Sequence, residues 1–371
     1  MKRILSFLYS FFLFLFAVYT YAYVDPNLSY FKNVYSEFVF SNRLLATFIY
    51  SIFVIFLFIF YGVFVRLALD KKIHLKDISL LIAITAGILF LSYPAMLSYD
   101  IFNYIATSRV LFFYHENPYI VMPIEFIGDP LLAFTHATNK VALYGPFWIL
   151  LTGISYLFGF GNFLAMLFSF KFLIVLFYLG TAFLIWKISR NLMSLILFAL
   201  NPLIVIETLI SGHNDIVMIF LVFLSLFLLM NKKIILGILF FILSIFIKYA
   251  TILLLPIFIF IIWRIARGNK INFGNVFYNS SLAMYIGFLL SPIREEIYPW
   301  YAIWFLSFVC LLPNRKLLLY SSIAFSLSLL FRYIPYMIAG IYTTPVPLVK
   351  EIVSFSFPSL IFIYYVFKKK I

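Results

Sequence analysis

The feature that most limits the folds open to this chain is a succession of about a dozen apolar runs, many close to the ~20 residues that cross a bilayer as a helix. Most of these runs end in basic residues. We therefore predict a series of membrane helices. They are expected at residues 4–22, 43–65, 78–97, 144–186, 191–210, 212–230, 234–247, 249–264, 275–291, 300–313, 316–331 and 352–367.

Composition supports the same fold class. Hydrophobic residues make up 65% of the 371 positions and charged residues 11%, and the mean hydropathy is +1.10. These values exclude a soluble globular domain and a disordered chain. We expect an all-α, polytopic transmembrane bundle of about 11–13 helices. It would form a single domain over residues 1–371, with a large external loop at 98–143 that carries juxtamembrane helices.

The net charge of +14 is concentrated in clusters at the ends of apolar runs. This placement is typical of cytoplasmic anchors and argues against nucleic acid as a partner. The first apolar stretch has no small-residue cleavage site, so we expect an uncleaved helix. The prediction is a multi-pass cell-membrane protein with both termini in the cytoplasm and loop 98–143 outside. The clusters are Lys2-Arg3; Arg66, Lys71, Lys72 and Lys76; Lys187 and Arg190; Lys232-Lys233; Arg264, Arg267 and Lys270; Arg315-Lys316; and Lys368-Lys369-Lys370.

Two places break the simple succession of spans. If 144–160 and 163–186 both crossed the bilayer, every later basic cluster would lie outside; we predict that the short 144–160 is re-entrant or incomplete. A straight helix over 234–263 would be ~45 Å long, against ~30 Å of hydrocarbon. We therefore predict two short helices that meet near Lys248-Tyr249 and place the lysine ammonium at headgroup depth.

The densest polar segment lies beside a predicted span, which is where chemistry is expected in so apolar a chain. Asp100, Asn103, Tyr104 and Thr107 are spaced i, i+3, i+4 and i+7. That spacing places them on one face of a helix lying along the membrane surface. A structural explanation also fits, because Ser98 or Asp100 would be a favoured helix N-cap. The two roles are compatible.

Further polar motifs lie on the same external side. Asn117-Pro118-Tyr119 and Tyr144-Gly145-Pro146 are turn formers, for which loop punctuation is the simpler interpretation. The segment Ser211-Gly212-His213-Asn214-Asp215 opens a predicted span. An N-cap would explain its first and last residues, but four polar groups exceed what a cap requires, so we favour a functional role.

Two external cations are candidates for binding an anion. Lys248 lies in the middle of an apolar run. A bound anion is therefore a better partner than lipid headgroups in general, although a snorkelling lysine is the alternative. Arg294 precedes Pro299-Trp300-Tyr301, whose rings would equally fit an interfacial aromatic belt.

No metal or nucleotide site is predicted. The four histidines have no histidine partner at i+3 or i+4, and Asp100 has no adjacent acidic residue. There is no phosphate-binding glycine loop. Cys310 is the only cysteine, which excludes an internal disulfide framework and a thiol metal cluster. We expect no cofactor; a divalent cation is compatible with the chain but has no support.

An ordered set of motifs runs through residues 90–305: Asp100, Tyr104, Arg109, Asn117-Pro118-Tyr119, Tyr144-Gly145-Pro146, Asn201-Pro202, Gly212-His213-Asn214-Asp215, Lys248 and Pro299-Trp300-Tyr301. The order resembles the C superfamily of membrane glycosyltransferases, and most closely the polyprenyl-phosphate-mannose-dependent mannosyltransferases of prokaryotes. The chain departs from many members in its lone Asp100, where a paired acidic motif is common. It also has His-Glu before Asn-Pro-Tyr, where glycine is frequent.

The resemblance implies transfer of a hexose, with mannose expected, from a polyprenyl-phosphate donor to a glycan or glycolipid acceptor at the non-cytoplasmic face of the lipid membrane, with inversion. It implies that Asp100 is the general base and that Lys248 and Arg294 stabilise the departing phosphate. The substrate-binding candidates are Asn103, Tyr104, Arg109, Asn117, Tyr119, Tyr144, His213, Asn214, Asp215, Trp300 and Tyr301.

Two other classes of protein would share some of these features. A flippase or transporter of lipid-linked sugar would also enclose charges in a helical bundle, but such proteins commonly show paired repeats and a midplane site. No repeat is evident, and Glu207 is the one candidate for a midplane acid. A noncatalytic scaffold would not need the external carboxylates.

Overall fold

The computed structural model describes residues 2–24, 36–131, 135, 137–293 and 296–368, and these residues contain helices but no strand. Seven of the described helices are long and apolar enough to cross a membrane. This result confirms the predicted all-α, polytopic class. The seven are Arg3–Tyr23, Arg43–Leu69, Phe163–Ser189, Tyr249–Ala266, Phe273–Ile293, Lys316–Ala339 and Val346–Lys368.

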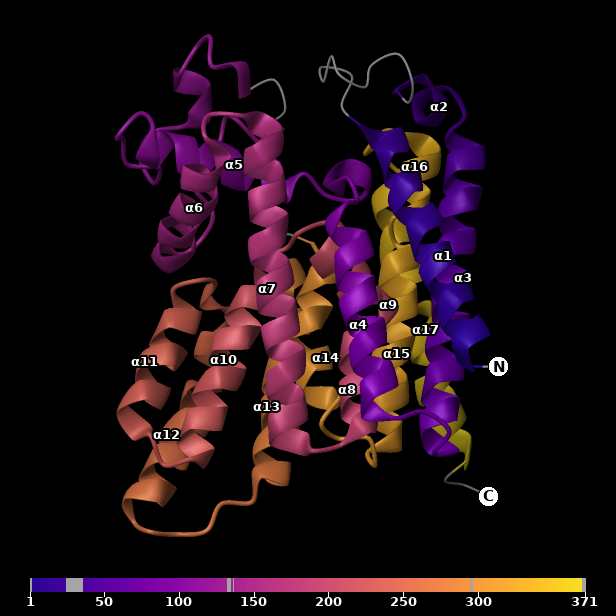
Figure 1. Cartoon of the computed structure of the whole chain (residues 1–371), viewed down its shortest axis with the longest axis vertical. Helices are drawn as coiled ribbons and strands as arrows, with labels where there is room; N and C mark the ends of the chain where they lie inside the picture. Colours follow the sequence, from indigo (N-terminus) through magenta and orange to yellow (C-terminus); the bar gives the residue numbers. More distant parts are fainter. Residues whose placement is uncertain (1, 25–35, 132–134, 136, 294–295, 369–371) are drawn as a thin grey trace.

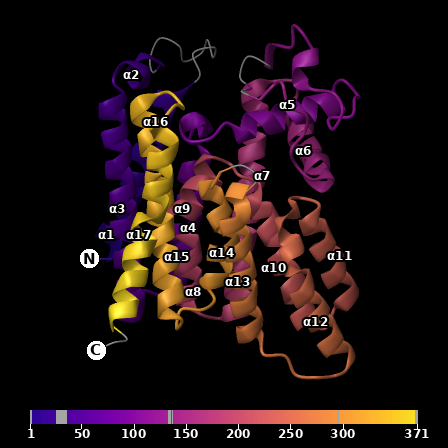
Figure 2. The same cartoon turned by 180° about the vertical axis from the view of Figure 1, so that it is seen from behind.

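The helices form two groups on either side of α7 (Phe163–Ser189), as both Figure 1 and Figure 2 show. One group contains α1 (Lys2–Thr20), α3 (Arg43–Leu69), α4 (Leu75–Phe90), α8 (Leu192–Ala199), α9 (Pro202–Val205), α15 (Lys316–Phe331), α16 (Ile334–Ala339) and α17 (Val346–Lys368). The other contains α10 (Asp215–Met230), α11 (Ile234–Ile245) and α12 (Leu255–Ala266), with α13 (Phe273–Leu290) and α14 (Ala302–Val309) between the groups. The short α2 (Ser36–Ser41) lies at the upper end.

Two helices lie above α10–α12 at the upper end of the molecule: α5 (Asp100–Phe112) and α6 (Pro146–Gly159). With 14 residues, α6 is about 21 Å long, which is less than the ~30 Å of hydrocarbon. This length agrees with the prediction that 144–160 is incomplete or re-entrant, and whether it crosses stays a prediction. The helix ends where Phe160 and Gly161 both adopt positive φ angles, of 47° and 72°.

Several other predicted spans are shorter or more bent than the hydropathy pattern indicates. The helices near 212–230, 234–247 and 300–313 have fewer than 18 residues. The predicted span 191–210 bends by 53° between Ala199 and Pro202, because proline has no backbone N–H and its ring disrupts the helix before it. Asn201 starts the second arm by accepting hydrogen bonds from Leu203 and Ile204 N–H.

The predicted break near Lys248 is present as the tip of a helical hairpin. The 3₁₀ helix η6 (Tyr249–Leu254) joins α11 to α12, and the rings of Phe241 and Phe258 stack between the two arms at 3.8 Å. The tip is attached to the start of α6, where Gly145 N–H donates to Ile247 O at 3.1 Å and Phe147 N–H to Phe246 O at 3.0 Å.

A buried lysine holds the end of α4 against α7. The Lys171 ammonium donates to Leu89 O at 2.9 Å, to Ser92 Oγ at 2.6 Å and to Ser92 O. The last carbonyl groups of a helix have no hydrogen-bond donor within the helix, and they carry a partial negative charge. A lysine side chain supplies both the missing donors and a positive charge. This cap fixes the point from which the chain continues to α5.

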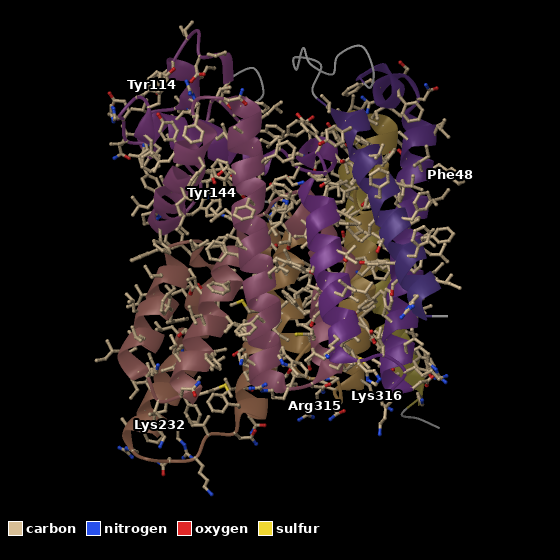
Figure 3. The ribbon with its side chains drawn as sticks, viewed as in Figure 1. Phe48, Tyr114, Tyr144, Lys232, Arg315 and Lys316 are labelled. Carbon is tan, nitrogen blue, oxygen red and sulfur yellow. The ribbon has the colours of Figure 1, made fainter. Side chains whose placement is uncertain are left out.

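Several basic side chains lie at one end of the molecule, and exposed apolar side chains cover the outer faces of its helices. Lys232, Arg315 and Lys316 lie at the lower end in Figure 3, whereas Tyr114 lies at the upper end. Phe48, on the outer face of α3, is 62% exposed. Exposed phenylalanine and leucine side chains also occur along α1, α12 and α17. Such an apolar outer surface is what a bilayer solvates.

Candidate active site

The candidate site begins at the N-terminus of α5. Asp100 is the first residue of that helix, and its backbone N–H donates to Ser98 Oγ at 3.2 Å. The N-cap residue is Tyr99, which makes no side-chain capping bond, so the predicted N-cap at Ser98 or Asp100 was wrong. The Ser98 hydroxyl instead accepts from the first helical N–H, and the Asp100 carboxylate is left for other contacts. Its side chain keeps 25% of its accessible surface.

A buried histidine links Asp100 to a second carboxylate. His213 Nδ1 lies 3.4 Å from Asp100 Oδ2, and His213 Nε2 lies 3.2 Å from Glu207 Oε2. The imidazole is stacked on the indole of Trp300, with ring centroids 4.0 Å apart. The other oxygen of Glu207 accepts a hydrogen bond from Tyr333 OH at 2.8 Å. Asp100, His213 and Glu207 thus form a continuous row, which we call the acid–histidine row.

A local irregularity of the backbone brings Glu207 into this row. Residues Ile206–Ile210 form a π-helical turn (η5) after α9, a distortion that is frequent at functional sites. Gly212 follows with a φ of +76°, and a side chain there would meet Ile101 at 2.9 Å. The positive φ favours glycine here, and a larger residue would also displace the end of the Ile101 side chain.

Asp100 and His213 are held in their charged forms near neutral pH. Burial favours a neutral His213, but the contacts and charges of Asp100 and Glu207 outweigh it and raise its pKa to about 9. Burial likewise opposes the charge on Asp100, yet His213 and, through space, Lys248 lower the pKa of that carboxyl from its ordinary value. Each ring nitrogen faces one carboxylate at an ion-pair distance, without hydrogen-bond geometry among the described residues.

Lys248 reaches the same region but is already paired. Its ammonium lies 2.9 and 3.0 Å from the two oxygens of Asp215, a buried residue that also accepts a hydrogen bond from Trp304 Nε1. It lies 4.7 Å from the centroid of the Tyr301 ring. The lysine side chain is 20% exposed. Asp215 offsets the charge of Lys248, and its predicted role in binding a phosphate stays a prediction.

Tyr104 is the packing centre of the site. Its hydroxyl accepts a hydrogen bond from Asn214 N–H at 3.3 Å, and its ring meets those of Tyr144 and Trp148 edge-on at 4.8 and 4.9 Å. Several residues of α5, η5 and the 211–214 segment carry buried polar atoms without a hydrogen-bond partner among the described residues. They include Asn103 Oδ1, Thr208 Oγ1, Ser211 Oγ and both amide atoms of Asn214. Buried groups of this kind are costly unless water or a ligand satisfies them.

Comparison with protein families bears on what this site does. The model of the MptA_B family, described as alpha-(1->6)-mannopyranosyltransferase, N-terminal domain, matches residues 8–265. The chain belongs to this mannosyltransferase family. Searches of curated proteins and of solved structures found no match. The family indicates that the enzyme is an alpha-mannosyltransferase, which requires a sugar donor and a glycan acceptor.

The matched segment of the mannosyltransferase contains Asp100, Glu207, His213 and Lys248, whereas Trp300 lies beyond it. The sequence had singled out Asp100 and His213 for the site. Glu207 was considered only as a transporter-type midplane acid, because a single glutamate in an apolar run has no neighbouring polar pattern to mark it. Its contact with His213 depends on the π-helical turn.

Other predicted substrate-binding residues of the mannosyltransferase lie apart from the row. The Arg109 Nε is 2.7 Å from Asp129 Oδ2, and nine residues rotate a helix by about 180°, which places Arg109 on the face opposite Asp100. Asn117 Oδ1 accepts from Tyr119 N–H at 3.0 Å, and Tyr119 OH donates to Tyr144 O at 2.8 Å. Both contacts shape the loop. Arg294 lies outside the described residues.

In the part of the mannosyltransferase that the structure describes, no three His, Cys, Asp or Glu side chains converge on a point where a metal ion could sit. Asp100, His213 and Glu207 lie close together but do not converge on one point where a metal ion could bind. The imidazole lies between the carboxylates of Asp100 and Glu207 and separates them.

Proposed function

We propose that the protein is an inverting, polyprenyl-phosphate-mannose-dependent mannosyltransferase of the GT-C type. It would transfer mannose to a hydroxyl of a glycan or lipid-linked acceptor at the non-cytoplasmic face of the membrane. The observation that carries the proposal is the partly exposed Asp100 carboxylate, held ionised by His213 at 3.4 Å. The match to an alpha-mannosyltransferase family supports the sugar.

Asp100 suits the role of general base. A hydroxyl becomes strongly acidic only as its oxygen bonds to the anomeric carbon, so an ionised carboxylate within hydrogen-bond reach can accept its proton during attack. In the proposed step the acceptor oxygen forms a bond to the anomeric carbon while the bond from that carbon to the phosphate oxygen breaks. The proton goes to Asp100, and polyprenyl phosphate leaves with the bonding electron pair.

His213 and Glu207 would position the base. The buried His213 ring lies against one oxygen of Asp100 and would leave the other for the acceptor, and Glu207 helps to raise the pKa of the ring. The unpartnered atoms of Asn214 and Ser211 are suited to hydrogen-bond sugar or acceptor hydroxyls. Trp300, stacked on His213, offers an aromatic face beside them.

The orientation in the membrane follows from the charges. Lys232, Arg315 and Lys316 gather at the lower end (Figure 3), and basic residues mark the cytoplasmic side. Tyr144 and α5 lie toward the opposite end. We infer that the catalytic carboxylate faces the non-cytoplasmic side, where nucleotide-activated sugars are not available and a membrane-anchored donor can enter laterally.

The donor assignment is tested with purified protein in detergent or vesicles. Labelled mannosyl polyprenyl phosphate and a nucleotide-linked mannose are offered separately with a mannose-terminated oligosaccharide acceptor. We expect an α-linked mannosyl product from the lipid-linked donor alone. Product from the nucleotide sugar would contradict the donor. Movement of intact lipid-linked sugar between leaflets without a new glycosidic bond would indicate a flippase.

A further inference from the structure

The proposed donor carries a phosphate, and the described site offers it few unpaired cations. Arg109 is paired with Asp129 and Lys248 with Asp215. A phosphate that leaves with its negative charge needs positive charge or strong donors nearby. The pocket beside α5 has such a cation at its mouth.

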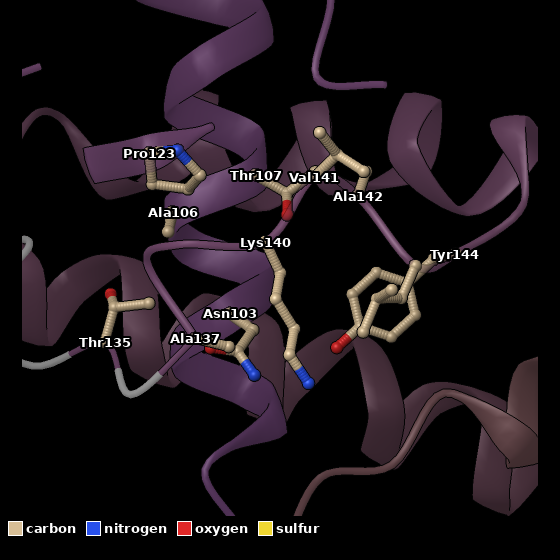
Figure 4. A pocket seen from close by; sticks show the side chains of 11 residues that line it. Asn103, Ala106, Thr107, Pro123, Thr135, Ala137, Lys140, Val141, Ala142 and Tyr144 are labelled. Atoms are coloured by element: carbon tan, nitrogen blue, oxygen red, sulfur yellow. The ribbon is translucent and has the colours of Figure 1, made fainter. Parts of the chain in front are cut away.

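The pocket opens against the same face of α5 that carries Asp100. Asn103 and Thr107 line it from the helix, and Lys140 and Tyr144 line it from the segment that leads to α6. Figure 4 shows the Lys140 side chain extending in the direction of Asn103 and Tyr144. Asn103 lies one turn, about 4.5 Å along the axis, from Asp100. The pocket and Asp100, the partly exposed end of the acid–histidine row, therefore lie along the same face of α5.

The Lys140 side chain differs from the paired cations. It is exposed, and among the described residues it has no acidic partner within 4 Å, in contrast to Arg109 and Lys248. A lysine ammonium is a compact charge on a flexible stem, which suits it to follow a phosphate group. No structural role in the described fold accounts for its position beside Asn103.

Asn103 supplies a second, independent feature. Its Oδ1 atom is buried and has no hydrogen-bond partner among the described residues. A carbonyl oxygen does not attract phosphate, but it accepts a hydrogen bond from a hydroxyl. The pocket therefore places a hydroxyl acceptor beside an ammonium, a combination that fits a sugar joined to a phosphate.

The size of the pocket limits what enters it. Its free volume is about 20 Å³, the room of about one water molecule. One sugar hydroxyl fits this space, whereas the phosphate would remain at the mouth, within reach of the exposed lysine. The isoprenoid chain would then extend away from α5 into lipid.

We propose that Lys140 binds the phosphate of the polyprenyl-phosphate sugar and that Asn103 accepts a hydrogen bond from a hydroxyl of the same sugar. The proposal rests on the proposed function for its donor. It assigns to Lys140 the contact that the sequence had suggested for Lys248, whose charge is offset by Asp215.

Direct binding of polyprenyl phosphate tests this assignment without requiring turnover. A charge-assisted hydrogen bond contributes about 1.5–3 kcal/mol, so Lys140→Met should raise the Kd roughly 10- to 100-fold. Lys140→Arg should restore binding to within a few-fold of wild type. Lys270→Met is the matched control, since Lys270 is an exposed lysine in the loop between α12 and α13, and its Kd should not change.

Further ligands identify the group that is bound. The non-phosphorylated polyprenol should bind equally weakly to wild type and Lys140→Met, and inorganic phosphate should compete with polyprenyl phosphate only weakly. An unchanged Kd for Lys140→Met would overturn the assignment and leave the proposed function standing. Failure of wild type to bind polyprenyl phosphate would overturn both.

Kinetic measurements distinguish the proposed role of Lys140 from that of Asn103. Lys140→Met should raise the KM for the donor, whereas Asn103→Ala should discriminate less between donors with and without the contacted sugar hydroxyl. Its affinity for polyprenyl phosphate itself, which has no sugar, should stay within about twofold of wild type. An Asn103→Ala variant that loses polyprenyl phosphate binding would contradict the assigned division of roles.

Discussion

At the level of single residues, the proposed proton transfer to Asp100 depends on the ionisation of the acid–histidine row. His213 helps to keep Asp100 ionised. The ring of His213 is itself charged because the carboxyl groups of Asp100 and Glu207 face it. The pKa of His213 is raised to about 9, and the pKa of Asp100 is lowered. Both groups are therefore in their proposed working forms over a wide range around neutral pH.

The pH dependence of the rate should report both groups. We expect kcat/KM to fall in acid as Asp100 is protonated, below its ordinary pKa of about 3.9, and to fall again as pH rises through about 9 and His213 loses its proton. His213→Gln should remove the alkaline limb and shift the acid limb upward, because the carboxylate loses its cation. An alkaline limb that persists unchanged in His213→Gln would contradict the assignment.

The raised pKa of His213 also makes the free energy of unfolding depend on pH. A group whose folded pKa is raised stabilises the fold fully below its unfolded pKa, about 6.5 for histidine, and loses that contribution as pH rises through the folded value. The contribution of His213 should therefore decline between pH 6.5 and about 9.

At the scale of elements, the site depends on the contact between the α11–α12 hairpin and the start of α6. Lys248 lies in the hairpin tip as the N-cap residue of η6, and Tyr144 precedes α6. The two backbone hydrogen bonds from Gly145 and Phe147 join them. A Cβ atom at Gly145 would overlap the backbone carbonyl of Phe246, which a rotamer change cannot relieve.

Gly145→Ala should push the hairpin tip away from the start of α6. Overpacking of this kind costs about 1–3 kcal/mol, so we expect a lower unfolding temperature and at least tenfold slower transfer. Gly87→Ala is the matched control, because its added Cβ would meet no atom within 4 Å and alanine favours a helix interior. Thermal unfolding and transfer rate are measured for both variants. Equal behaviour of the two would show that the hairpin contact does not organise the site.

Much of the arrangement of elements could be predicted from the sequence. The length of the apolar run over 234–263 indicated a break near Lys248, and the charge pattern indicated the incomplete helix at 144–160. The i, i+3, i+4 spacing correctly placed a helix that starts at Asp100. These features depend on local periodicity, length and charge, which a single sequence displays directly.

Pairings between distant residues could not be predicted in this way. Lys248 and Asp215 are 33 positions apart, and nothing in either local pattern identifies the other as its partner. Glu207 reaches His213 only through a π-helical turn. Lys140 lies in an irregular loop, so no helical period relates it to Asn103. Such contacts arise from tertiary packing, which hydropathy does not encode.

At the scale of the whole molecule, the proposal requires the α5 end and the basic end to face opposite sides of the membrane. Ile127, near α5, is 96% exposed. Asn269, in the loop after α12, is also exposed. Cys310 is buried, so it should react slowly with an added thiol reagent and can be replaced by alanine.

Single cysteines at these two positions test the orientation. In intact cells that carry Cys310→Ala, an impermeant maleimide should label Ile127→Cys, whereas Asn269→Cys should react only after the membrane is opened. The positive-inside distribution of basic residues is the physical reason. The reverse pattern would place Asp100 on the cytoplasmic side and contradict the lipid-linked donor.

The most direct test of the central claim is sugar transfer by Asp100→Asn. The substitution keeps the size of the side chain but removes the proton acceptor, so we predict that transfer from labelled mannosyl polyprenyl phosphate falls at least 100-fold. Unfolding temperature and polyprenyl phosphate binding should stay close to wild type. Asp70→Asn, at the C-terminal end of α3, is the matched control and should retain activity. Turnover by Asp100→Asn at a rate near that of wild type would contradict the account.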